Sequence, residues 1–421
     1  MSGCGPLEHG RAHRQARLEV ADIFRAHGQA VRERRDLTPE QRRVMASIVN
    51  CRTEVLGGHA DLCPECGHID VSYNSCRDRH CPKCQALPAA RWIDARRQRV
   101  IPTHYFHLVF TLPRELRQLV LRNRRVCFDL LFRSASSTLL ELGSDPKWLG
   151  GRLGITAVLH TWTRELHFHP HIHCVVTGGG LDEDCSWHHA NEDFLFPVKV
   201  LSALFRGKML DGIRRLAQAG QLDLSCFGEP DLSSAAFKQT IAALYKKPWV
   251  VYAKRPFGGP KAVFAYLGRY THRVAISNQR LIAFHNASVT FHTKGTKKVS
   301  VCAETFIRRF LLHVLPRGFV RLRHYGLLAP AHARTSLEIA RGLLEGAVRL
   351  APSSEVSDQQ SADVLDESPP DDQPRLDEMS WEVLLARLTG TDVRVCPSCG
   401  AKTRRVGLHD PALAPEEVDT S

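Results

Sequence analysis

The sequence lacks any long apolar run and any export signal. Hydrophobic residues make up 43% of the 421 residues, but they are never continuous over the about 18 residues that a transmembrane helix needs. The first thirty residues are polar and arginine-rich, without the apolar core of a secretory signal. We therefore expect a cytoplasmic protein with no membrane partner, whose fourteen cysteines are reduced and available to metals.

Acidic residues are scarce outside one segment. Residues 351–378 contain nine Asp or Glu and one Arg, a local charge of −8. Because the whole chain carries +13, the rest of the chain carries +21. Such a basic body predicts a polyanionic partner, most simply DNA, and a nucleoid-associated location. The acidic segment is rich in Ser, Asp, Gln and Pro without periodicity, which predicts a disordered linker.

Two Cys-x-x-Cys pairs, separated by fourteen residues, predict a structural zinc site. The pairs are Cys63 with Cys66 and Cys81 with Cys84. Each pair turns the backbone so that two thiolates can meet one ion, and two pairs complete a tetrahedron. Four neighbouring residues could replace a ligand or serve a second ion: Cys51, His59, Cys76 and His80.

A third pair, Cys396 and Cys399, follows a short helix expected over residues 381–388. It is half of a zinc ribbon, because one pair supplies only two of the four ligands. Two interpretations stay open: an unoccupied pair, or a site completed by His409 or by another chain.

Residues 169–177 alternate apolar and polar side chains and lead into three glycines, which predicts a β-strand. In a strand, residues two apart share a face, so His171 and His173 project together while Ile172 points into a core. The simpler alternative is a polar sheet face that carries histidines by chance. Because His167 and His169 extend the same face, we favour a divalent cation site.

Residues 260–273 are expected to form a helix with Pro near its start. Tyr266 and Tyr270 are four residues apart and therefore share a helical face. Paired tyrosines at this spacing are often packing residues. The basic residues around them favour a phosphate-facing surface instead: Lys261, Arg269 and Arg273.

The order and spacing of these motifs resemble a known family. The cysteine cluster of 63–84, HPHIHCVVTGGG at 169–180 and YLGRYTHRVAISN at 266–278 together resemble the two-tyrosine HUH rolling-circle transposases of bacterial insertion sequences. These carry an N-terminal transposase zinc-binding domain. LPRGFVRLRHYGLLA at 315–329 is also similar to that family, and the resemblance covers about residues 35–335.

The resemblance implies a metal-dependent endonuclease and ligase acting on single-stranded transposon ends and target DNA. Tyr266 and Tyr270 would be the catalytic nucleophiles, and the attack would leave a 5′-phosphotyrosine. His171 and His173 would hold Mg²⁺ or Mn²⁺ at the scissile phosphate. Two histidines are too few ligands, and His169 is a candidate for the third.

The element pattern predicts an α+β fold. Strands and helices alternate as strand-helix-strand-strand-helix-strand, the pattern of a ferredoxin-like, or split βαβ, sheet. Strands are expected near 104–112, 154–162, 169–177 and 249–254, and residues 304–350 are expected to be helical and basic. The predicted domains are a helical and zinc-binding DNA-binding domain at 14–100, an HUH catalytic domain at 101–300, a basic helical arm at 301–350, an acidic linker at 351–378 and a tail with half a zinc knuckle at 379–421.

Three rival functions follow from parts of the same sequence. A noncatalytic zinc-finger DNA-binding protein would explain the charge and the cysteines but would leave the His strand and the Tyr helix without a role. A tyrosine recombinase is suggested by Arg323-His324-Tyr325, but that class needs no metal. A replication initiator or relaxase would share the HUH core. The sequence leaves open the recognised DNA, the tyrosine that attacks first and the oligomeric state.

Overall fold

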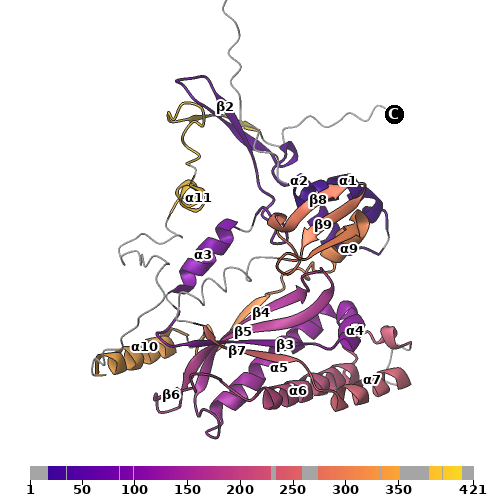
Figure 1. Ribbon diagram of the computed structural model, residues 1–421, viewed down its shortest axis with the longest axis vertical. Coiled ribbons are helices and arrows are strands. Elements are labelled where there is room, and N and C mark those ends of the chain that lie inside the picture. The colour runs from indigo at the N-terminus through magenta and orange to yellow at the C-terminus, as the bar shows by residue number, and fades with distance from the viewer. Residues whose placement is uncertain are drawn as a thin grey trace, which may run out of the picture.

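The computed structural model describes most of the chain in three packed parts (Figure 1). The described residues are 18–34, 36–84, 86–97, 99–228, 234–257, 274–331, 333–350, 379–390 and 392–409. Among these residues, no helix has both the length and the apolar character required to cross a membrane. The predicted tyrosine helix and the predicted acidic linker lie outside the described residues.

The largest part is an antiparallel sheet with the strand order β11-β4-β5-β3-β7. Strand β6 pairs with the end of β5, also antiparallel. Its strands are β3 (Tyr105–Thr111), β4 (Arg152–Trp162), β5 (Phe168–Leu181), β6 (Trp187–His189), β7 (Val251–Phe257) and β11 (Leu322–Gly326). Strands β3 and β4 run parallel to one another, with β5 inserted between them. This is a split βαβ arrangement, and the prediction of an α+β, ferredoxin-like sheet is confirmed.

Helices cover one face of this sheet (Figure 1). They are α4 (Arg117–Arg122), α5 (Arg124–Ser144), α6 (Val198–Gln218) and α7 (Ala235–Lys246). Ile172, Cys174 and Val176 alternate along β5 and lie in the same core as α5 and α6. The intervening residues of β5 project to the opposite face, because side chains alternate along a strand. The histidines of β5 are therefore directed away from this helical layer.

The second part joins the N-terminal helices to a segment far along the chain. Helices α1 (Val20–Arg32) and α2 (Pro39–Asn50) pack with β8 (Leu281–His285), β9 (Ser288–His292), β10 (Lys298–Cys302) and α9 (Ala303–Leu311). Helix α2 begins as predicted, because Thr38 caps it and Gln41 completes the capping box. Leu166, at the turn between β4 and β5, lies in the same core.

The third part brings the two ends of the chain together. Its sheet has the order β12-β1-β2, formed by β1 (Gly58–Leu62), β2 (Ile69–Tyr73) and β12 (Arg404–His409). Helices α3 (Ala86–Arg97) and α11 (Trp381–Thr389) lie beside one another between this sheet and the body of the molecule (Figure 1). The helix expected at residues 381–388 is thus present as α11.

One expected helical region is wrong in part. Residues 304–350 contain α9 and α10 (Ala333–Leu350), but β11 lies between them and extends the main sheet beside β4. Gly326 ends this strand at φ +61°, and a Cβ there would lie 1.8 Å from the Leu153 carbonyl oxygen. The close approach of β11 to β4, set by tertiary pairing, therefore overrides the helical appearance of the local sequence.

Candidate functional site

Three histidines meet on the sheet face opposite α5 and α6. His171 and His173 come from β5, and His160 comes from β4, where it lies directly opposite His171. Their ligand nitrogens all lie within 4.8 Å of one another. His160 is buried, with 3% of its surface exposed, whereas His171 and His173 are half-buried. The arrangement offers three imidazoles to one cation from two rigid strands.

His160, and not His169, completes this cluster. His169 lies on the same face of β5, but it is not part of the group, and its Nδ1 accepts a hydrogen bond from Arg117 Nη2 at 3.3 Å. The suggestion of His169 as third ligand is therefore corrected. A register count across the β4–β5 hairpin would have found His160, because that hairpin pairs it with His171.

Hydrogen bonds fix the orientation of the two β5 histidines. His171 Nδ1 lies 2.7 Å from the His169 carbonyl oxygen. A carbonyl only accepts, so Nδ1 of His171 carries the proton and Nε2 carries the lone pair. His173 Nδ1 lies 2.9 Å from Nε2 of His107 on β3. Such partners orient metal-binding histidines and set their tautomers.

The environment keeps these imidazoles neutral. Burial lowers the pKa of His171 to about 4. Burial, followed by the neighbouring His160 and His171, lowers the pKa of His173 well below its ordinary value. Both side chains are therefore neutral near pH 7, which is the form that binds a metal ion.

The structure divides the predicted zinc ligands between two clusters. Cys81 and Cys84 gather with Cys51 and Cys76, whereas Cys63 and Cys66 gather with a different pair. The single site predicted from Cys63, Cys66, Cys81 and Cys84 is therefore corrected. The physical reason is the β1–β2 hairpin, which carries the first Cys-x-x-Cys pair at its turn and away from the second pair.

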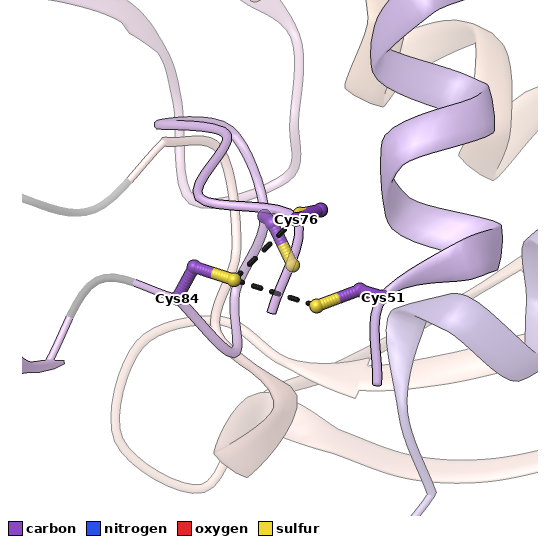
Figure 2. A group of neighbouring side chains, drawn as sticks. Cys51, Cys76 and Cys84 are labelled. Atoms are coloured by element: carbon purple, nitrogen blue, oxygen red, sulfur yellow. Dashed lines mark hydrogen bonds between the residues drawn. The ribbon is translucent and has the colours of Figure 1, made fainter. Parts of the chain in front are cut away.

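The first cluster connects α2 to the loop that follows β2. Cys51 caps the C-terminus of α2, and its sulfur lies 3.4 Å from the sulfur of Cys84 (Figure 2). The sulfur of Cys76 lies 3.6 Å from that of Cys84. Hydrogen bonds from Cys51 and then Cys76 lower the pKa of the Cys84 thiol, so a thiolate is available. Four thiols at these distances suit a closed, structural Zn²⁺ site.

His59 and His80, which the sequence offered as alternative zinc ligands, have other partners. His80 Nδ1 lies 2.8 Å from the Asp78 carboxylate, and His80 Nε2 accepts from the Leu315 N–H at 3.2 Å. Burial raises the pKa of Asp78, but the hydrogen bonds from His80 outweigh this and hold it at about 2. His59 lies 3.3 Å from the carboxylate of Asp61. Neither histidine belongs to a cysteine cluster.

The second cluster consists of Cys63, Cys66, Cys396 and Cys399. The C-terminal pair, expected to be half of a zinc ribbon, therefore meets its other half within the same chain. His409 instead lies at the end of β12, paired with Gly58.

Comparisons with known proteins identify the family of this chain. Residues 23–112 match a family described as "Transposase zinc-binding domain", and residues 154–336 match one described as "Putative transposase". The chain is 43% identical over 393 residues to "Putative transposase y4qJ" of Sinorhizobium fredii, covering 90% of this chain and 92% of that protein. The chain belongs to the IS91-type transposase family.

A second relative of this transposase is named for its element. The "Transposase for insertion sequence element IS801" of Pseudomonas savastanoi pv. phaseolicola is 29% identical over 294 residues, covering 68% of this chain and 69% of that protein. No solved structure gives a significant match. As a transposase, the protein acts on DNA and cleaves and rejoins it, and its N-terminal domain is of the zinc-binding kind.

Some arginines of the segment predicted as a basic helical arm, residues 301–350, have structural contacts. Arg323 pairs with the Asp129 carboxylate and lies over the ring of Phe132, 4.3 Å from its centroid. Arg309 donates to the carbonyl of Glu165 at 3.1 Å. Burial lowers the pKa of Arg321 to about 10. Within the described part of the chain, these arginines stabilise the fold around β11 and the β4–β5 turn.

Proposed function

We propose that this transposase nicks and rejoins single-stranded DNA in rolling-circle transposition, through a 5′-phosphotyrosine on Tyr266 or Tyr270. The observation that carries the proposal is the histidine cluster on the sheet face opposite α5 and α6, in a chain of this family. A cluster of this kind has no evident role in a protein that only binds DNA. We take His160, His171 and His173 as the residues that hold the catalytic cation.

The donor set indicates which cation fits. The cluster contains three imidazoles and, within the described residues, no carboxylate. Imidazole suits Mn²⁺ better than Mg²⁺, because Mg²⁺ prefers oxygen ligands. Three protein ligands leave further positions for phosphate oxygens and water. A cation bound there would polarise the scissile phosphate and neutralise the charge that develops on it.

The described ends of the tyrosine segment belong to two different parts of the molecule. Phe257 ends β7 beside Tyr105, which is paired with Thr177 of β5. Val274 lies in the same core as Leu166, at the other end of β5. His171 and His173 lie on the chain between Leu166 and Thr177. Residues 258–273 connect Phe257 to Val274, and this supports the proposal that Tyr266 and Tyr270 reach the histidine cluster.

In the proposed reaction, a tyrosine oxygen attacks the scissile phosphorus and the phenol gives up its proton. The bond from phosphorus to the 3′ oxygen of the preceding nucleotide breaks, and that oxygen takes up a proton to become a 3′ hydroxyl. The free phenol is a weak nucleophile because its ordinary pKa is about 10. The phosphotyrosine bond keeps the energy for rejoining, so no nucleotide triphosphate is needed.

Two tyrosines allow one site to hold two cleaved ends in turn. Unpaired bases would stack on aromatic side chains near the cluster. Trp162 stacks on the cluster residue His160, with ring centroids 4.5 Å apart, and Tyr252 of β7 is 50% exposed. Phe257, at the end of β7, is a further candidate for stacking in this proposal.

The direct test is nicking of a single-stranded oligonucleotide that carries the transposon end, in the presence of Mn²⁺. We expect the Tyr266→Phe, Tyr270→Phe double variant to lose nicking. A Tyr245→Phe control, on α7 at the opposite face of the sheet, should retain it. Undiminished nicking by the double variant would remove the phosphotyrosine proposal. Nicking that survives EDTA would favour a metal-independent tyrosine recombinase, and selective cleavage of a replication origin would favour an initiator or relaxase.

A further inference from the structure

Two segments more than 300 residues apart form the same local structure. Residues 63–67 and 396–400 both have the pattern Cys-Pro-x-Cys-Gly. In each, the first Cys N–H donates to the carbonyl of the fifth residue along, at 2.8 and 2.7 Å. Its own carbonyl accepts from the Gly N–H, at 3.0 and 2.9 Å, and that Gly has φ of +70° or +79°. Both segments are therefore zinc knuckles.

The four sulfurs of the two knuckles are close enough for one ion. Cys63 Sγ lies 3.4 Å from Cys399 Sγ, and Cys66 Sγ lies 3.6 Å from Cys396 Sγ. All four sulfurs lie within 4.8 Å of one another. Tetrahedral Zn²⁺ with Zn–S bonds of about 2.3 Å places its sulfurs about 3.8 Å apart. The observed spacing is near that value.

Strand pairing brings the knuckles together. Strand β12 runs antiparallel to β1, with Leu62 opposite Arg404 and Gly58 opposite His409. Strand β1 pairs in turn with β2, so the C-terminal segment supplies the third strand of the sheet (Figure 1). Each knuckle lies at one end of a strand in this sheet. Two knuckles on a three-stranded antiparallel sheet form a zinc ribbon.

We propose that Cys63, Cys66, Cys396 and Cys399 bind a second structural Zn²⁺ and close a zinc ribbon from the two ends of the chain. Residues 396–400 lie outside both family matches, which cover 23–112 and 154–336. The ion holds the C-terminal segment 392–409 on the N-terminal hairpin, independently of the peptide connection. This site is separate from the first cluster and does not depend on the cleavage chemistry.

Zinc content of the purified full-length chain tests the site. We expect two Zn²⁺ per chain in the unaltered protein and one in the Cys396→Ser, Cys399→Ser variant. The matched control replaces two exposed cysteines outside both clusters, Cys185→Ser with Cys302→Ser, and should retain two. One Zn²⁺ per chain in the unaltered protein, or equal zinc content in all three proteins, would overturn the proposal.

A cleavable chain tests whether the ion joins the two ends. A recognition sequence for a specific protease is inserted between residues 351 and 378, and the zinc-loaded protein is cut. We expect the C-terminal fragment to co-elute with the body in gel filtration, and to separate when Cys396 and Cys399 are Ser. Separation in the unaltered background would contradict the proposal, and so would equal retention in the variant.

Discussion

His160→Ala should weaken Mn²⁺ binding strongly. Among histidines that lie outside β5, its replacement should have the largest effect. His160 supplies one of three ligand nitrogens that lie within 4.8 Å of one another. Loss of an outer-shell partner typically costs about 10- to 100-fold in metal affinity. Loss of a direct ligand should reach at least the upper limit, about 100-fold, which corresponds to about 2.8 kcal/mol.

Replacement of two other histidines should weaken Mn²⁺ binding by smaller amounts. His107 contacts His173 of the cluster through its Nε2, so His107→Phe should cost about 10- to 100-fold. His169 lies on the same face but accepts from Arg117 and is outside the cluster, so His169→Ala should cost less than about threefold, as expected for a residue without a metal contact. The order of loss should be His160, then His107, then His169.

The assay is a titration of Mn²⁺ into zinc-loaded protein, followed by electron paramagnetic resonance of the unbound ion. Thermal unfolding of each variant guards against loss of the fold, because His160 is buried and contacts Trp162. If a folded His160→Ala variant binds Mn²⁺ as tightly as His169→Ala, the three-histidine site is wrong.

Three further outcomes test the fold. Burial lowers the pKa of His313 from 6.5 to about 3, so between these pH values the unfolded chain binds more protons than the folded chain. The free energy of unfolding should therefore fall as the pH falls from 6.5 to about 3. In urea titrations at several pH values, His313→Gln should reduce this pH dependence by an amount equivalent to at most about one proton. Phe310→Ala, at 0% exposure in the core shared by α1 and α9, should lower the free energy of unfolding by about 3–5 kcal/mol, whereas exposed Phe194→Ala should change it by less than about 0.5 kcal/mol. Gly326→Ala should destabilise the protein by at least about 2 kcal/mol, because Gly326 has a positive φ and a Cβ there would contact Leu153. Gly342→Ala in α10 has open space around it and should slightly raise the thermal unfolding temperature.

Sequence patterns within single helices and strands predicted those elements correctly. Alternation along residues 169–177 predicted β5, and the capping residues Thr38 and Gln41 predicted the start of α2. The positions of His171 and His173 on one face followed from the two-residue period of a strand. Each of these inferences needed only neighbours within one element.

Pairing between distant elements determined what the sequence did not reveal. His160 joins the cluster through the register of β4 against β5. Cys63 meets Cys399, 336 residues away, because β12 pairs with β1. The short spacing between the first two Cys-x-x-Cys pairs favoured a single local zinc site. That spacing does not reveal that pairing of β12 with β1 joins the first pair to the C-terminal pair instead. Strand β11 was missed for the same reason, because tertiary pairing with β4 determines its position at the edge of the sheet.

The central claim is that a tyrosine of residues 266–270 becomes joined to DNA at the histidine cluster. The most direct measurement is mass spectrometry of the peptide that carries a DNA adduct after incubation with a single-stranded transposon end and Mn²⁺. The account predicts a 5′-phosphate-linked nucleotide on Tyr266 or Tyr270, lost when His171 is replaced by Ala. Cleavage of the DNA with no adduct, or an adduct on a tyrosine elsewhere in the chain, would contradict it.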